Sequence, residues 1–166
     1  MLKKLLSFIL LWAIMLPVGC KADVSSIVVG NVKPAITQLG DSEATRTITV
    51  YVYHIDNIVT KTVLIEKYKL LENANIQDLE NYSNAVEDTF SSDIFQVKGF
   101  EYLAELEETS FTFRTAIDYT MLEYEDLEGE AKIYFYGEGS DLVDKDNNVL
   151  FDKLIEEYIG WGVDFE

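Results

Sequence analysis

The stretch TITVYVY, residues 47–53, is rich in β-branched and aromatic side chains, which are typical of a β-strand. Asp56 and Asn57 follow it, and both residue types tolerate the backbone angles of a tight turn. Residues 58–66 then form a second stretch of the same character. The sequence therefore predicts a β-hairpin at residues 47–66, and the other elements are expected to pack around it.

A helix is predicted directly after this hairpin. Apolar residues recur at steps of three and four, which places them on one helical face: they are Ile76, Leu79, Tyr82, Val86 and Phe90. The side-chain oxygen of Asn75 suits the N-terminal cap of such a helix. We expect the apolar face to lie on the sheet.

The remaining chain predicts a second hairpin and a second helix. Residues 100–106 and 111–117 alternate between polar and apolar side chains, as the two strands of a hairpin do. A short helical turn is expected at residues 120–127 and a further strand at residues 132–136. A helical stripe runs through Val149, Leu150, Leu154 and Tyr158 and ends at Gly160. This order of elements predicts an α+β fold: a two-layer sandwich of a mainly antiparallel sheet with helices packed on one face.

The first nineteen residues have the pattern of a bacterial signal peptide. Lys3 and Lys4 precede the uncharged apolar run 5–18, which is shorter than the roughly 20 residues that a spanning helix needs. The segment 16–20, Leu-Pro-Val-Gly-Cys, resembles the lipoprotein processing site, although Pro17 stands where leucine is usual. We therefore expect cleavage before Cys20 and a diacylglyceryl group on its thiol.

Two other interpretations of this segment stay open. An ordinary signal peptide would leave Cys20, the single cysteine, as a free thiol, and an uncleaved leader would act as the anchor itself. The predicted organisation is a signal peptide at residues 1–19, the lipidated Cys20 with a tether through residue 44, and one α+β domain at residues 45–166. The Gly, Pro and small polar residues of residues 21–44 favour a tether, and residues 27–29 could add a short strand.

The charge balance limits the classes of partner. The chain has 30 Asp and Glu against 13 Lys and Arg, a formal net charge of −17. A surface this negative repels the phosphate backbone of nucleic acids, so we expect no nucleic-acid partner. The expected partners are the membrane, through the N-terminal lipid, and an unknown protein or small ligand. No cofactor is expected.

This order of elements resembles the YehR-like bacterial lipoproteins over most of residues 45–162. The resemblance lies in the hairpin 47–62, the helix after it, the segment 99–102 (Gly-Phe-Glu-Tyr), the strand 111–119 with Ile-Asp-Tyr at 117–119, and the closing helix. It implies a two-layer α+β fold and an exported, lipidated protein. The family has no established function, so the resemblance implies no activity. The chain departs from the family in its longer stretch after Cys20 and in the acidic loop 141–148.

The sequence contains no recognisable set of catalytic residues. His54 is the single histidine, and no nucleophile accompanies it. Pairs of carboxylates could serve acid–base chemistry on glycans, but among 30 acidic residues such pairs arise by chance. The sequence therefore predicts a protein that is not an enzyme.

Two candidate binding features remain. Asp144, Asp146 and Asn148 have the spacing that opens a calcium loop, but Val149 and Ile155 occupy the places of its glycine and its bidentate glutamate. The pattern is therefore incomplete, and no metal site is predicted from it. Strand tyrosines could form a platform for a peptide or sugar, or pack in the core; the candidates are Tyr51, Tyr53, Tyr102 and Tyr119.

The leader and the missing catalytic set together predict a lipoprotein anchored at the outer face of the cell membrane. We expect a domain that binds a ligand or partner through a sheet face. The alternatives are a structural or assembly component of an envelope complex, and an envelope hydrolase.

Overall fold

The computed structural model describes residues 25–123, 127, 129–136 and 141–166. Its strands are β1 (Ser26–Leu39), β2 (Ser42–Ile55), β3 (Ile58–Leu70), β4 (Phe100–Leu106), β5 (Ser110–Asp118) and β6 (Val163–Phe165). Its helices are α1 (Ile76–Phe90), the 3-10 turn η1 (Asp93–Phe95), α2 (Gly129–Tyr136) and α3 (Phe151–Gly160). Among these helices none is long and apolar enough to cross a membrane.

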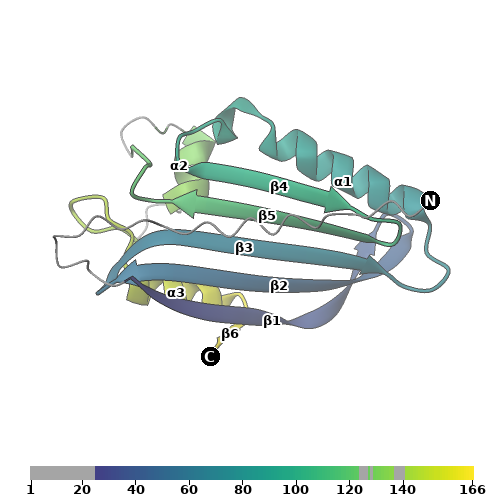
Figure 1. Cartoon of the computed structure of the whole chain (residues 1–166), viewed down its shortest axis with the longest axis horizontal. Coiled ribbons are helices and arrows are strands. Elements are labelled where there is room, and N and C mark those ends of the chain that lie inside the picture. Colours follow the sequence, from purple (N-terminus) through teal and green to yellow (C-terminus); the bar gives the residue numbers. More distant parts are fainter. Residues whose placement is uncertain (1–24, 124–126, 128, 137–140) are drawn as a thin grey trace, which may run out of the picture.

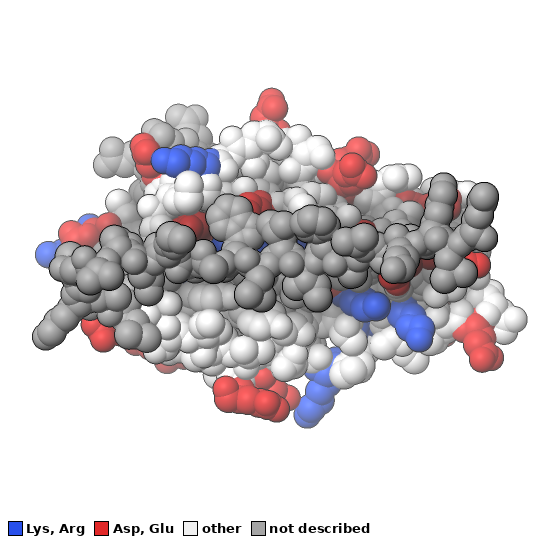
Figure 2. All heavy atoms as spheres, viewed as in Figure 1, with Lys and Arg blue, Asp and Glu red and all other residues white. Residues whose placement is uncertain are grey.

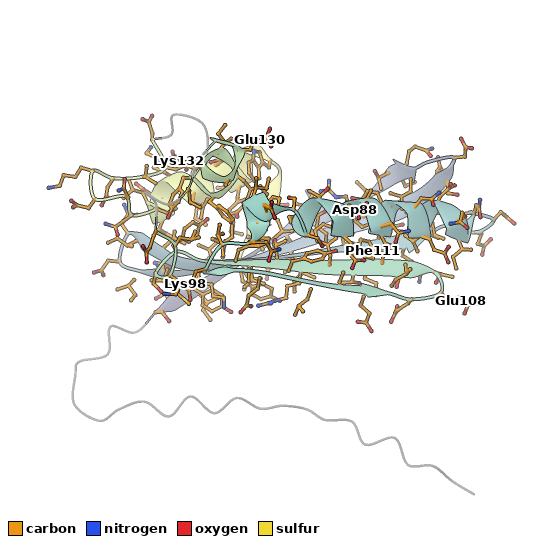
Figure 3. All side chains as sticks on the ribbon, turned by 90° about the horizontal axis from the view of Figure 1, so that it is seen from above. Asp88, Lys98, Glu108, Phe111, Glu130 and Lys132 are labelled. Atoms are coloured by element: carbon orange, nitrogen blue, oxygen red, sulfur yellow. The ribbon has the colours of Figure 1, made fainter. Side chains whose placement is uncertain are left out.

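The strands form one antiparallel sheet in the order β4-β5-β3-β2-β1-β6 (Figure 1). The helices of the described residues all lie on one side of this sheet (Figure 3). We call the opposite side, which carries none of these helices, the bare face. The predicted α+β fold, with a mainly antiparallel sheet and helices on one face, is confirmed.

The hairpin predicted at residues 47–66 is the β2–β3 pair, with Val50 opposite Leu64. Its turn places Asp56 at a φ of 51°, a left-handed angle that aspartate tolerates better than most residues. Asn57 ties the turn to the start of α3, because its amide donates to Asp152 Oδ1 over 3.0 Å and its Oδ1 accepts from the Asp152 backbone N–H.

The predicted tether is wrong from Ser26 onward, because β1 pairs with β2 along nearly its whole length. The residues that suggested a tether have other roles. A Cβ on Gly30 would lie 2.6 Å from the Phe165 ring, so glycine lets β6 approach the sheet. Pro34 lies at the register shift between Val32 and Ala35, where a missing N–H costs no ladder bond. Gly40, at a φ of 61°, makes the β1–β2 turn.

Helix α1 begins and ends where the sequence predicts. The Asn75 side chain caps it by accepting from the Gln77 N–H over 3.1 Å. Leu79 is completely buried beneath it, and Phe111 on β5 lies under the helix (Figure 3). One core cluster therefore fills the space between α1 and the sheet: its buried members are Leu39, Ala44, Tyr68, Leu79, Phe111 and Phe113. We call this part of the molecule the α1 end.

A second core cluster lies under α2, α3 and β6, and we call this part the α2–α3 end. The hairpin β4–β5 and helix α3 are as predicted. The strand predicted at residues 132–136 is wrong, because these residues belong to α2. Its sequence is rich in β-formers, but a helix buries Ala131 and Phe135 together, one turn apart, against η1 and β4.

Two further differences concern short segments. Residues 119–121 form a turn and not the start of the helix predicted at 120–127, of which residues 124–126 lie outside the described part. Strand β6 was not predicted, because its three residues are too few to show a period. It pairs with β1 at Gly30–Val32 and extends the sheet by one strand.

Candidate functional site

A cleft opens on the helix-covered face between α1 and the pair α2 and α3. Its larger lobe has a volume of about 600 Å³. The floor comes from alternate residues of β3 and β5, including Thr62, Leu64, Glu66, Phe113 and Thr115. The walls come from the helices and the turn after α3: Phe90, Tyr134, Leu154, Glu157, Tyr158 and Trp161. We refer to this space, with the smaller lobe described next, as the cleft.

A smaller lobe of about 430 Å³ adjoins the first. The two lobes share four lining residues: Leu64, Glu66, Tyr158 and Trp161. The smaller lobe adds the Arg46 side chain and an apolar wall from β1, β2 and β6, including Val32, Ile48 and Val163. The shared residues make Glu66 and Trp161 the centre of the cleft.

Glu66 is a charged residue in the middle of the sheet, and only 9% of its surface is exposed. Its Oε2 accepts from Arg46 Nη2 at 2.7 Å, from Arg46 Nε at 2.8 Å and from Tyr68 Oη at 2.8 Å. The Tyr82 hydroxyl on α1 donates in turn to Tyr68 Oη over 2.8 Å. A buried charge is tolerated only when it is paired and hydrogen-bonded, and this network supplies both.

The two Arg46 nitrogens and the Tyr68 hydroxyl all donate to the same oxygen of Glu66, Oε2. Within the described residues no donor to Oε1 is found, and Glu66 lines both lobes. The carboxylate therefore offers the cleft one acceptor oxygen, while the other oxygen holds the side chain in place.

Tyrosine hydroxyls surround the floor on the side of α2 and α3. Burial, with a smaller contribution from the charges of Tyr134 and Glu157, raises the pKa of Tyr158 to about 12, although a hydrogen bond with Thr62 acts in the opposite direction. Partial burial, opposed by a hydrogen bond with Thr115 and assisted by the charge of Glu66, raises the pKa of Tyr134 to about 12. Burial also raises the pKa of Tyr119. These phenols stay protonated at neutral pH and supply neutral hydrogen-bonding groups.

The four tyrosines predicted as one platform lie on opposite faces, so the prediction of a single platform is wrong. Val52 pairs with Thr62, which lines the cleft, so Val52 lies on the same face of the sheet. Because successive strand residues alternate between faces, its neighbours Tyr51 and Tyr53 lie on the bare face. Tyr119 lines the cleft. Tyr102 stacks on Phe90 at 4.9 Å, and its buried hydroxyl has no partner among the described residues.

The bare face of the sheet is a second candidate surface. Ile27 on β1 is 53% exposed and Leu103 on β4 is 63% exposed, and both lie on this side with Tyr51 and Tyr53. Figure 2 views the molecule from this side and shows Asp and Glu side chains around the rim, with fewer Lys and Arg. Strand β4 also forms an end of the sheet.

The residues of the incomplete calcium-loop pattern are brought together by hydrogen bonds of their own. Asp144 Oδ1 accepts from the backbone N–H groups of Asp146 at 2.8 Å and Asn148 at 3.0 Å, and Asn148 Nδ2 lies 3.1 Å from Oδ2. The backbone bond from Asn148 is the main cause that lowers the pKa of Asp144. Among the described residues no group of three or more acidic, His or Cys side chains is placed to hold a metal ion.

His54 and Cys20 are the remaining residues considered from the sequence. His54 stacks on Phe151 at a ring distance of 3.8 Å, and its Nδ1 lies 2.8 Å from the Asp56 carbonyl oxygen, so it supports the β2–β3 turn. Cys20 lies outside the described residues.

Sequence reasoning missed Glu66, Arg46 and Trp161 as site residues. A signal was present, because Arg46 directly precedes the first predicted strand and Glu66, of opposite charge, ends the second, where apolar residues are the rule on a covered face. The pairing of Ile48 with Glu66 and of Arg46 with Tyr68 makes the two charges diagonal neighbours on one face.

Comparison with known proteins supports the fold. No family model and no curated protein matches the chain. The NMR structure of a protein from Streptococcus pneumoniae TIGR4 is similar, with a TM-score of 0.51 over 99% of this chain and 98% of that one, at 12% sequence identity. At that identity the similarity shows a shared fold alone, and the resemblance to the YehR-like lipoproteins stays a prediction.

Proposed function

We propose that this protein is a lipid-anchored binding protein at the outer face of the cell membrane, without enzymatic activity, and that the cleft is its ligand site. The observation that carries the proposal is the cleft itself. Its larger lobe, of about 600 Å³, has the size and the mixed lining of a small-molecule site: mostly apolar and aromatic walls with a few polar groups.

The held position of Glu66 supports a binding role. A carboxylate fixed by Arg46 and Tyr68 needs no rearrangement to meet a ligand, so little ordering entropy is lost on binding. Glu66 and Glu157 both line the cleft, which is the arrangement that a hydrolase would use. However, three hydrogen bonds already occupy Oε2 of Glu66, and this engagement favours a structural and binding role over proton transfer.

The position of β1 has a consequence for the anchor. Only residues 21–25 separate Cys20 from Ser26, and five extended residues span at most about 18 Å. A lipid on Cys20 would therefore hold the β1 edge of the domain close to the bilayer. The proposed anchoring is short, in contrast to the long tether expected from the sequence.

Labelling cells with a radiolabelled fatty acid tests the anchoring. We expect label on the wild-type protein and none on Cys20→Ala, which has no other thiol. Edman sequencing or mass spectrometry of the purified protein should find Cys20 as the first residue. Absence of label on the wild type, or label that survives Cys20→Ala, would contradict the proposal.

A structural or assembly role in an envelope complex is the second candidate, favoured by the exposed apolar residues of the bare face. A photo-crosslinking amino acid at Ile27 or Leu103 should then capture a discrete protein in intact cells. Ile159 on α3, which is 57% exposed, provides the matched control away from the bare face. Equal capture from all three positions would argue against a defined interface on the bare face.

A further inference from the structure

We propose that the cleft binds an organic cation, an apolar or aromatic body with an ammonium group, and that Glu66 Oε1 receives the ammonium. This inference rests on the proposed function, because it names the ligand class of the same site.

The charges that line the larger lobe are of one sign. Glu66 lies in its floor and Glu157 in its wall, and among the described residues that line this lobe none is Lys or Arg. Arg46 lines only the smaller lobe, where it is engaged with Glu66. The larger lobe therefore favours positive charge, and the net charge of −17 steers cations toward the molecule as a whole.

The hydrogen-bonding state of Glu66 adds direction to this charge. Arg46 and Tyr68 fill Oε2, whereas Oε1 has no donor among the described residues. An ammonium has three N–H donors and no acceptor, so it complements an acceptor oxygen and the neutral phenols of Tyr134 and Tyr158. A carboxylate in the same place would meet two like charges.

The aromatic residues give an independent reason for a cation. Trp161 is 64% exposed and lines both lobes, and it packs edge-on to Tyr158 at a ring distance of 5.3 Å. Tyr134 and Phe90 face the larger lobe from the opposite helices. The faces of such rings carry negative charge density, and they attract ammonium groups beside them.

The apolar floor specifies the rest of the ligand. Leu64, Phe113 and Ile117 from the strands and Leu154 from α3 present carbon surfaces around Glu66. A ligand that placed only a charge in the cleft would leave these surfaces in water. An aromatic amine satisfies both parts of the lining, because its ring covers apolar surface while its ammonium reaches Glu66.

The chain offers a specific reporter for this binding. It has two tryptophans, Trp12 in the predicted leader and Trp161 in the cleft, so the processed protein keeps Trp161 alone. We suggest incorporating 5-fluorotryptophan, reconstituting the processed lipoprotein in lipid nanodiscs and recording ¹⁹F spectra. Loss of the signal in Trp161→Phe assigns it, and empty nanodiscs correct for partition of the probe into lipid.

Three probes of nearly equal shape separate charge from hydrophobicity: tryptamine, the neutral alcohol tryptophol and the anion indole-3-propionate. We expect tryptamine to shift the Trp161 signal with an affinity about tenfold or more above that of tryptophol, as a charged hydrogen bond would give. Indole-3-propionate should bind more weakly than either.

Two substitutions identify the carboxylates. Glu66→Gln keeps an acceptor oxygen for Arg46 and removes the charge, so the preference for tryptamine over tryptophol should fall to about two- to threefold or less. Glu157→Gln leaves the Arg46–Glu66 pair intact and should reduce the preference by about two- to threefold. Glu105→Gln, an exposed carboxylate on the bare face, is the matched control and should change nothing.

The outcomes separate this inference from the proposed function. If tryptophol or indole-3-propionate binds as tightly as tryptamine, the cation inference is overturned while the cleft remains a ligand site. If none of the three shifts the Trp161 signal, the ligand site itself is overturned and the inference with it. Should Glu66→Gln fail to fold, Glu157→Gln decides: an undiminished preference for tryptamine counts against the role of the carboxylates.

Discussion

The α1 end and the α2–α3 end cover the same face of the same sheet, but they are built differently. One helix of 15 residues covers the α1 end, with a cap at Asn75 and a second tie from Ser42 Oγ to Asp78 at 2.6 Å. Helices of 8 and 10 residues and the three-residue β6 cover the α2–α3 end. Helix α3 begins at Phe151; the side chain of its N-cap residue Leu150 makes no capping bond, and Asn57 from the β2–β3 turn accepts from the Asp152 N–H instead.

This difference places the cleft. A long amphipathic helix covers its part of the sheet continuously, and its core cluster includes the fully buried Leu79. Short elements leave more of the sheet to be covered by loops and single side chains, and the largest lobe of the cleft lies where α1 stops at Phe90 and α2 and α3 begin. The α1 end is expected to be the rigid support, and the α2–α3 end the part that adapts to a ligand.

The largest expected difference between the ends is the cost of removing one buried leucine. Leu79→Ala should lower the free energy of unfolding by about 3–5 kcal/mol, because a fully buried site leaves a cavity that its neighbours cannot fill. Leu154→Ala, at a residue that already lines the cleft, should cost about 2 kcal/mol. Urea unfolding followed by circular dichroism measures both. An equal or larger loss for Leu154→Ala would contradict the comparison.

A second test acts on the α2–α3 end alone. Gly30→Ala places a methyl group 2.6 Å from the Phe165 ring and against Val163, so β6 must move. We expect a loss of about 1–3 kcal/mol, the usual cost of overpacking. Hydrogen exchange should rise in β6 and α3 and stay unchanged in α1.

Gly160→Ala is the matched control for that test. A Cβ at Gly160 meets no atom within 4 Å, and the residue ends α3 with helical backbone. The variant should be neutral or slightly more stable, by up to about 1 kcal/mol. Exchange that rises in α1 as much as in β6 for Gly30→Ala would show that the two ends unfold as one unit.

The two ends also differ in how far the sequence predicts them. Residues 76–90 show a full helical period and a cap, and these local signals agree with the packing of Leu79 and Tyr82, so helix α1 was predicted correctly. Residues 132–136 favour a strand by composition, yet contacts with Phe95 and Phe100 hold them in a helix. Those contacts join residues far apart in the chain, and the sequence pattern does not contain them.

The candidate site depends on the same long-range information. Which face a strand residue occupies follows from register, and a single bulge changes it, as the extra residue Thr60 does in β3 opposite Tyr53 and His54. The sequence therefore indicated tyrosines of interest but could not show that Tyr51 and Tyr119 face opposite sides. Sequence reasoning passed over Glu66 and Arg46, and the contact between them depends on the pairing of β2 with β3.

Removing the cap of α1 should have a smaller effect than either core substitution. Asn75→Ala takes away the acceptor for the Gln77 N–H and should cost about 1 kcal/mol, within the range of measured N-cap losses. Asn84→Ala, at an exposed position in the middle of α1, is the control and should be neutral or slightly stabilising, since alanine is the better helix former. Thermal unfolding of the two variants in one buffer compares them. If Asn84→Ala lowered the stability as much as Asn75→Ala, the loss of the cap would not explain the destabilisation.

The smallest expected effect on stability at neutral pH is that of the Tyr158 phenol at the α2–α3 end. Its effect on the free energy of unfolding grows only at alkaline pH. Its pKa is about 12 in the folded protein and 10.0 in the reference state, because burial and the charges of Tyr134 and Glu157 disfavour the phenolate. Between these values the folded state binds more protons than the unfolded state, so the free energy of unfolding falls as pH rises from about 10 to 12, by at most about 2–3 kcal/mol.

Tyr158→Phe should make the slope of stability against pH shallower in this window and leave it unchanged below pH 9. Urea unfolding at a series of pH values measures this slope. Tyr51→Phe on the bare face, where the side chain is only partly buried, is the control for the removal of a phenol outside the α2–α3 end. If Tyr51→Phe flattens the slope as much as Tyr158→Phe does, the alkaline loss does not come from the phenol at the α2–α3 end.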